Sequence, residues 1–174
     1  MPVCWPWFGD LQRNPEAIRT TYARPADAPA HGLVRDRDWQ LIGLDTREDG
    51  ATLSFAYDTA AQPIAEWPFA AELQLDIHLG ERLALSLTTR NLGDRELPIS
   101  QALHTYFAVS DVRQVRIEGL EGRSYIDTLQ DWKSVRQQGA VTFSGETDRI
   151  YLDTPAQLSI CLLYTSDAAD DMQC

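Results

Sequence analysis

Cysteine is scarce in this chain of 174 residues, and the three that occur, Cys4, Cys161 and Cys174, lie far apart. An odd, widely spaced set of cysteines gives neither a disulfide framework nor the close ligand spacing of a metal site. A reducing compartment fits this usage. We therefore expect a cytoplasmic protein without a bound metal ion.

Positive charge is also scarce, because 15 lysines and arginines stand against 26 acidic residues and give a net charge of −11. A nucleic-acid backbone or an anionic membrane surface needs a basic face, so neither partner is expected. No apolar run reaches the roughly eighteen residues of a membrane span, and no basic segment typical of a signal peptide opens the chain. An anionic substrate would need a local basic cluster, which the N-terminal part of the chain supplies with Arg13, Arg19, Arg24, Arg35 and Arg37.

Helical periodicity is nearly absent, and alternation of apolar and polar residues replaces it in the rest of the chain. This alternation over residues 52–57 and 73–90 is typical of half-buried antiparallel strands. Gly80-Glu81 lies within the second segment and predicts a hairpin connection there. Shorter strands are expected near residues 115–117, 141–143 and 150–152. The fold class is therefore predicted to be an all-β antiparallel sandwich.

The length of the chain fits one domain, and we expect residues 1–160 to form a β-sandwich that is incomplete at both ends. One short helix is predicted, with Asn14 as its N-cap and Pro15 at its first position. The aromatic and proline-rich N-terminus is typical of a functional loop with no preceding strand. Residues 161–174 resemble translated sequencing-adapter read-through and are predicted to be a non-native tail. An ordinary acidic C-terminal segment is the alternative.

One histidine has the surroundings of a catalytic group on a predicted strand, residues 99–109. Alternation places Ile99, Leu103, Phe107 and Val109 toward the core, and the opposite face holds Ser100, Ala102, His104, Tyr106 and Ala108. Because that face is mostly small, His104 has space for a ligand, and imidazole titrates where acid/base catalysis at neutral pH needs it. A purely structural histidine is the alternative.

A second candidate segment contains His31 beside Gly32, which suggests a close approach of two backbones. Arg35 follows four residues after His31 and could hold an anion in the same pocket through its planar guanidinium. His78 alternates with the apolar residues of its strand, so we expect it on the opposite face and assign it no function.

Four segments in this order resemble the hexose-6-phosphate mutarotase branch of the aldose 1-epimerase family. They are residues 2–9 (PVCWPWFG), 31–35 (HGLVR), 101–107 (QALHTYF) and 148–153 (DRIYLD). One such motif could match by chance, but four in order make the resemblance specific. It covers about residues 1–160 and implies a galactose mutarotase-like β-sandwich.

The resemblance implies interconversion of the α and β anomers of a hexose 6-phosphate, such as glucose 6-phosphate, without a cofactor. Ring opening needs a proton on the ring oxygen while another proton leaves the anomeric hydroxyl, so two groups act from opposite sides of one pocket. By resemblance, the acid role falls on His104. Substrate binding falls by resemblance on His31, Arg35 and Asp148, with Arg35 on the phosphate or the ring and Asp148 on the sugar hydroxyls.

The sequence departs from the family pattern at two functional positions. The family's general base is a glutamate in a late strand, beyond the equivalent of residue 160, and no matching motif is found here. An arginine that the family places ahead of the segment 2–9 would precede Met1. We therefore expect this chain by itself to be an inactive fragment.

A non-catalytic carbohydrate-binding module is the alternative from a different functional class. Its sugar-stacking residues would be Trp5, Trp7, Tyr106 and Trp132. A structural interaction domain, in which His104 only makes hydrogen bonds within a sheet, is a further alternative. It would bind no sugar at all.

Overall fold

A computed structural model describes residues 1–162 of the chain. The chain divides into two compact units, Met1–Tyr106 and a second that starts at Phe107. The single domain predicted for residues 1–160 stays a prediction, and the tail predicted at 161–174 lies almost wholly outside the described residues.

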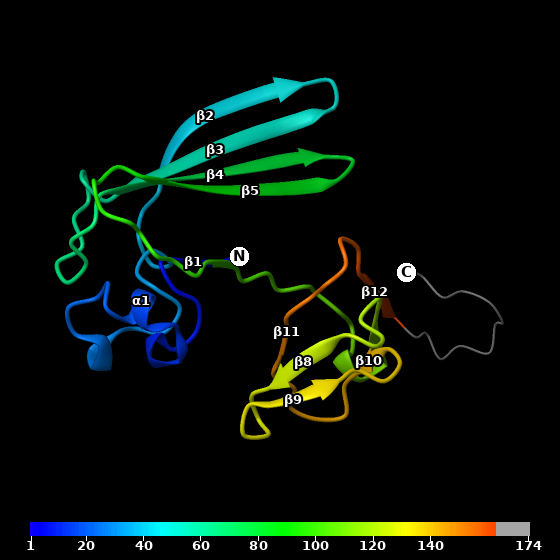
Figure 1. The fold of residues 1–174 in the computed structure, drawn as a ribbon. Coiled ribbons are helices and arrows are strands. Elements are labelled where there is room, and N and C mark those ends of the chain that lie inside the picture. Colours follow the sequence, from blue (N-terminus) through cyan, green and yellow to red (C-terminus); the bar gives the residue numbers. More distant parts are fainter. Residues whose placement is uncertain (163–174) are drawn as a thin grey trace. The chain divides into compact units, whose positions relative to one another are not determined.

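Most of the regular secondary structure in the described chain is antiparallel strand, which confirms the all-β prediction (Figure 1). In chain order they are β1 Val3–Cys4, β2 Gln40–Arg47, β3 Gly50–Asp58, β4 Ala71–Gly80, β5 Leu83–Asn91, β6 Ala102–Leu103, β7 Val115–Glu118, β8 Ser124–Asp127, β9 Lys133–Arg136, β10 Val141–Thr142, β11 Arg149–Tyr151 and β12 Ser159–Leu162. The helices are short: α1 Glu16–Arg19 and the 3₁₀ turns η1 Leu11–Arg13, η2 Pro25–Asp27 and η3 Val112–Gln114.

The first unit is built on a four-stranded sheet with the order β2-β3-β4-β5, drawn in cyan to green in Figure 1. Strand β3 confirms the predicted strand 52–57, and β4 with the edge strand β5 confirms the predicted hairpin 73–90, with Leu79 opposite Leu83 at the connection. The connection is Glu81-Arg82, one residue later than expected. Strand β2 was not predicted, because a register shift between Leu41 and Gly43 interrupts its alternation.

The core of the first unit is made by the N-terminal loop and by one face of the sheet. Trp5 and Trp7 are fully buried beside Tyr57 and Leu73 of the sheet. The sequence suggested a loop with no strand to hold it in place. In the structure the loop is held by the pairing of β1 with β6 and by a bridge between Trp5 and Gly32. Trp5 and Trp7 of this loop therefore belong to the hydrophobic core.

Two details of the sequence prediction are wrong. Asn14 does not cap α1, because its side-chain Nδ2 donates to the carbonyls of Phe8 and Asp10, and Pro15 takes the N-cap position. Within the predicted strand 99–109 only β6 is regular, and Phe107, expected in the core, is 67% exposed. Ile99 and Leu103 pack against the core as predicted.

The second unit contains two three-stranded sheets, β10-β7-β12 and β11-β8-β9. They confirm the strands predicted near residues 115–117, 141–143 and 150–152, although β10 and β11 are shorter or shifted by a residue. Cys161 in β12 and Cys4 in β1 are both buried, and Cys4 is a free thiol. None of the helices in the described part is long and apolar enough to cross a membrane.

Candidate functional site

Two histidine rings from distant parts of the sequence meet in the first unit. The ring centroids of His31 and His104 lie 5.4 Å apart, and the ring planes cross at 74°. His31 belongs to the loop that approaches Trp5, and His104 follows directly after β6. The fold therefore brings together two of the residues that the sequence nominated for the site.

The position of His31 depends on two close contacts of the backbone. Its N–H donates to the Gly9 carbonyl at 2.8 Å, and Gly9 N–H donates back to Nδ1 of the imidazole at 3.3 Å. The next residue, Gly32, lies so near Trp5 that no Cβ fits there. Because Nδ1 accepts a hydrogen bond, the neutral ring carries its proton on Nε2.

The surroundings of His31 also favour the neutral imidazole. Burial lowers its pKa below the usual value for histidine, and electrostatic interactions with Arg35 and then with His104 lower it further. The ring at this position is therefore neutral at neutral pH, and its Nε2–H is suited to donate a hydrogen bond to an oxygen atom.

His104 has an anchored backbone and an unpaired ring nitrogen. Its N–H donates to the Pro2 carbonyl at 3.0 Å. Its Nδ1 is buried and has no hydrogen-bond partner among the described residues. A buried nitrogen without a hydrogen-bond partner is uncommon in proteins, and its partner is then usually a water molecule or a bound ligand. His104 is thus the one histidine of this unit with an unused, shielded nitrogen.

Two exposed aromatic residues flank the histidine pair. The Phe8 ring lies 5.2 Å from His31 and 5.9 Å from His104, and the Tyr106 ring lies 4.9 Å from His104. Tyr106 was expected on the same strand face as His104, whereas no role was expected for Phe8. Its place just before Gly9, inside the aromatic N-terminal segment, was the available signal.

Arg35 is exposed and lines a cleft of about 640 Å³ together with Gly32, Leu33 and Arg37. Among the described residues neither Arg35 nor Arg37 makes an ion pair, and Glu66, an acid of this cleft, is held by Arg24 at 2.6 Å. Two unpaired guanidiniums in a chain of net charge −11 are suited to an anion.

Asp148, the fourth nominated residue, belongs to the second unit, where it directly precedes β11. It is exposed, and its carbonyl accepts hydrogen bonds from Thr128 N–H at 3.1 Å and Thr128 Oγ1 at 3.2 Å. Its role in sugar binding stays a prediction.

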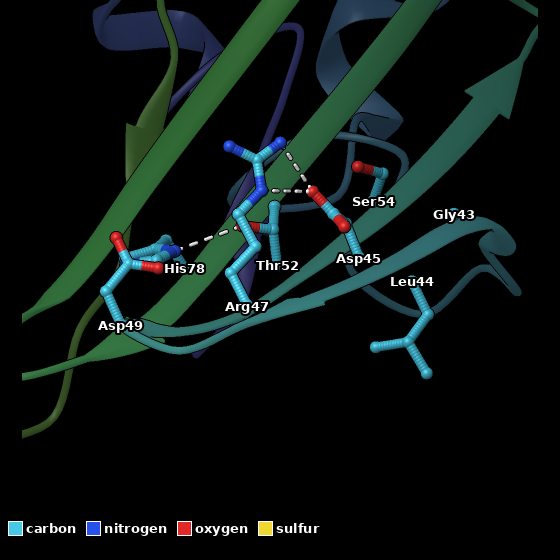
Figure 2. Close-up of a pocket in the computed structure, with 8 residues that line it drawn as sticks. All are labelled: Gly43, Leu44, Asp45, Arg47, Asp49, Thr52, Ser54 and His78. Carbon is cyan, nitrogen blue, oxygen red and sulfur yellow. Dashed lines mark hydrogen bonds and ion pairs between the residues drawn. The ribbon is translucent and has the colours of Figure 1, made fainter.

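A second depression, of about 460 Å³, lies on the polar face of the four-stranded sheet. Figure 2 shows Arg47 reaching toward Asp45, with 2.7 Å between Nη2 and Oδ2, and His78 joined to Thr52 by a hydrogen bond of 3.0 Å. His78 therefore lies on the polar face, as predicted. Because both basic side chains of this depression are partnered, we assign it no function. No group of metal-binding residues is found within residues 1–162.

The pKa of His31 gives a direct test of the electrostatics. Replacing Arg35 by glutamine is expected to raise the pKa of His31, because a positive charge that opposes the imidazolium is removed. The measurement is an NMR pH titration of the imidazole signals. Arg37→Gln is the matched control, since the charge of Arg37 acts on the Tyr57 phenol instead. If the pKa of His31 were the same in Arg35→Gln and in the unmodified chain, the charge of Arg35 would not act on this imidazole.

Comparisons with known proteins agree with one another. The family model described as Aldose 1-epimerase matches residues 1–168. A protein of Escherichia coli (strain K12) named "Putative glucose-6-phosphate 1-epimerase" is 33% identical over 154 residues, which are 88% of this chain and 47% of that protein. A protein of the same name from Cenchrus ciliaris is 32% identical over 171 residues, with 92% of this chain and 47% of that protein covered.

A solved structure gives the same result for the fold. The crystal structure described as a "putative mutarotase" from Salmonella typhimurium superposes with a TM-score of 0.75 at 29% identity, over 91% of this chain and 48% of that one. The chain thus spans about half the length of the curated relatives that it matches.

Proposed function

The chain belongs to the aldose 1-epimerase family, and from this we propose that it serves the interconversion of the α and β anomers of a hexose 6-phosphate, such as glucose 6-phosphate. The reaction needs proton transfers at the ring oxygen and at the anomeric hydroxyl, and neutral imidazole and imidazolium perform such transfers near neutral pH. The proposed chemistry uses the protein's own acid/base groups and no cofactor.

The observation that carries the proposal is the pair of histidine rings 5.4 Å apart. The two rings differ in whether Nδ1 has a hydrogen-bond partner within the protein. His31 has its Nδ1 occupied by Gly9, so it serves as a fixed donor that holds the sugar. His104 keeps Nδ1 unpaired and serves as the acid that protonates the ring oxygen. The pair thus supplies the acid and a residue that holds the sugar, and ring opening needs in addition a base that takes the proton of the anomeric hydroxyl.

The phosphate group is assigned to Arg35. The support is that its guanidinium has no acidic partner among the described residues and that its charge reaches His31. Planar guanidinium groups bind phosphate through two parallel hydrogen bonds. Asp148 is proposed to bind the sugar hydroxyls, in line with the resemblance.

The carbohydrate-binding module loses support from the burial of its aromatic residues. Trp5 and Trp7, two of its four predicted stacking residues, are fully buried in the core and offer no face to a sugar. No observation on the described residues favours this second function over the first.

The proposal is tested by saturation-transfer NMR between the two anomers of glucose 6-phosphate, in a protein of the relatives' length that carries this chain. Accelerated exchange between the anomers is expected, and binding without exchange would favour the module instead. The 174-residue chain, purified free of host mutarotase, is expected to bind without accelerating exchange. Robust catalysis by that chain would refute the prediction that it lacks the general base.

A further inference from the structure

We propose that Phe8 is the surface on which the hexose ring stacks, so that the sugar lies against the two histidines in a single orientation. This inference rests on the proposed function and deepens it by naming a residue that determines how the substrate binds. Phe8 would contact the substrate without taking part in proton transfer.

Phe8 is the aromatic residue that touches both histidines. Its ring centroid lies 5.2 Å from that of His31 and 5.9 Å from that of His104. A ligand that contacts both imidazoles therefore also passes over or beside this ring. Tyr106 is close to His104 alone, at 4.9 Å, and is 71% exposed.

The exposure of Phe8 is unusual for its segment. The neighbouring aromatic residues Trp5 and Trp7 are fully buried, whereas Phe8 is 40% exposed. Part of the Phe8 ring is therefore accessible to a ligand, unlike the rings of the two tryptophans. An apolar ring exposed beside polar imidazoles is the pattern of a ligand site, in which aromatic side chains give contact area and a few polar groups fix the orientation.

Hydrogen bonds fix the backbone of Phe8 on both sides. Its N–H donates to Ser100 Oγ at 3.2 Å, and its carbonyl accepts a hydrogen bond from Asn14 Nδ2 at 3.0 Å. Ser100 and Asn14 are also hydrogen-bonded to each other. The following residue, Gly9, binds His31 Nδ1. One short segment thus fixes both the aromatic ring and the imidazole beside it.

A sugar matches this arrangement chemically. One face of a pyranose ring presents C–H groups, which pack on an aromatic ring, while its hydroxyls point outward to hydrogen-bonding partners. With the C–H face on Phe8, the hydroxyl edge and the ring oxygen face His31 and His104. Inorganic phosphate has no such face, so its affinity should not depend on Phe8.

The experiment measures binding of glucose 6-phosphate and of inorganic phosphate to the 174-residue chain, followed by NMR shifts of the imidazole signals. In Phe8→Ala the affinity for glucose 6-phosphate is expected to fall about tenfold, the effect of losing part of the burial of one aromatic side chain. The affinity for inorganic phosphate is expected to stay unchanged. Phe8→Trp should restore sugar binding, and Phe8→Leu, which fills space without an aromatic face, should not.

Phe107→Ala is the matched control, because Phe107 is 67% exposed and makes no ring contact with either histidine among the described residues. Equal sugar affinity in Phe8→Ala and the unmodified chain would overturn the inference and leave the proposed function intact. Full recovery by Phe8→Leu would reduce Phe8 to a packing residue and overturn it as well. If the unmodified chain bound phosphate but no sugar, the proposed function and this inference would fail together.

Discussion

Replacing His104 by alanine is expected to lower the rate of anomer exchange at least about a hundredfold, which is the usual contribution of one general acid/base group. The reason is specific to this ring, because its buried Nδ1 has no protein partner and its neighbour His31 is committed to Gly9. Exchange is measured by saturation-transfer NMR in a protein of the relatives' length that carries this chain. His104→Gln, which keeps a polar side chain, should lose as much.

The control for this prediction is the third histidine. His78 lies on the polar face of the sheet, where it is hydrogen-bonded to Thr52. His78→Ala is therefore expected to leave exchange unchanged. Exchange at the unmodified rate in His104→Ala would remove the assignment of the acid, whereas equal losses in both variants would indicate a general effect on folding.

Replacing Gly32 by alanine is expected to destabilise the chain by about 3 kcal/mol or more, the range in which backbone strain adds to steric overlap. The added Cβ would lie 2.2 Å from the Trp5 carbonyl oxygen and 2.8 Å from the Trp5 nitrogen. The φ of +80° is also a conformation that L-residues rarely adopt. Because both obstacles are backbone, no side-chain rotation relieves them.

The measurement is urea unfolding followed by tryptophan fluorescence, to which the buried Trp5, Trp7 and Trp67 of the first unit contribute. Gly9→Ala is the matched control, since Gly9 has a similar φ of +68° but nothing within 4 Å of the added Cβ. It should cost only the conformational penalty of about 1 to 2 kcal/mol. Equal losses in the two variants would show that the close approach of Gly32 and Trp5 contributes nothing.

Local patterns in the sequence predicted the regular parts of the fold well. Alternation of apolar and polar residues predicted β3 and the β4–β5 hairpin, because a sheet with one buried face imposes a period of two on every strand. Strand β2 was not predicted, because the register shift between Leu41 and Gly43 interrupts the period of two. The pattern is informative only where the pairing is regular.

The segment around His104 shows where local reasoning ends. Residues 100–104 run antiparallel to the N-terminal loop, with Ser100 N–H donating to the Pro6 carbonyl at 2.9 Å and His104 N–H to Pro2 at 3.0 Å. Only Ala102–Leu103 is regular strand, and the chain beyond departs from the predicted alternation, so Phe107 is exposed. The loop that pairs with this segment lies about a hundred residues earlier, and no local pattern encodes that pairing.

By itself, the sequence determined the all-β class of this protein, the strands with regular alternation and the nomination of His31, Arg35 and His104. Side-chain period and residue chemistry are local properties, and a single sequence carries them. Only the tertiary structure decided that His31 and His104 meet at 5.4 Å, that Phe8 lies beside both, and that Trp5 and Trp7 are buried. These facts depend on the N-terminal loop, which contacts Gly32 through Trp5 and Ser100 through Phe8. The contacting residues lie far apart in the chain, and no local sequence pattern shows that such contacts form.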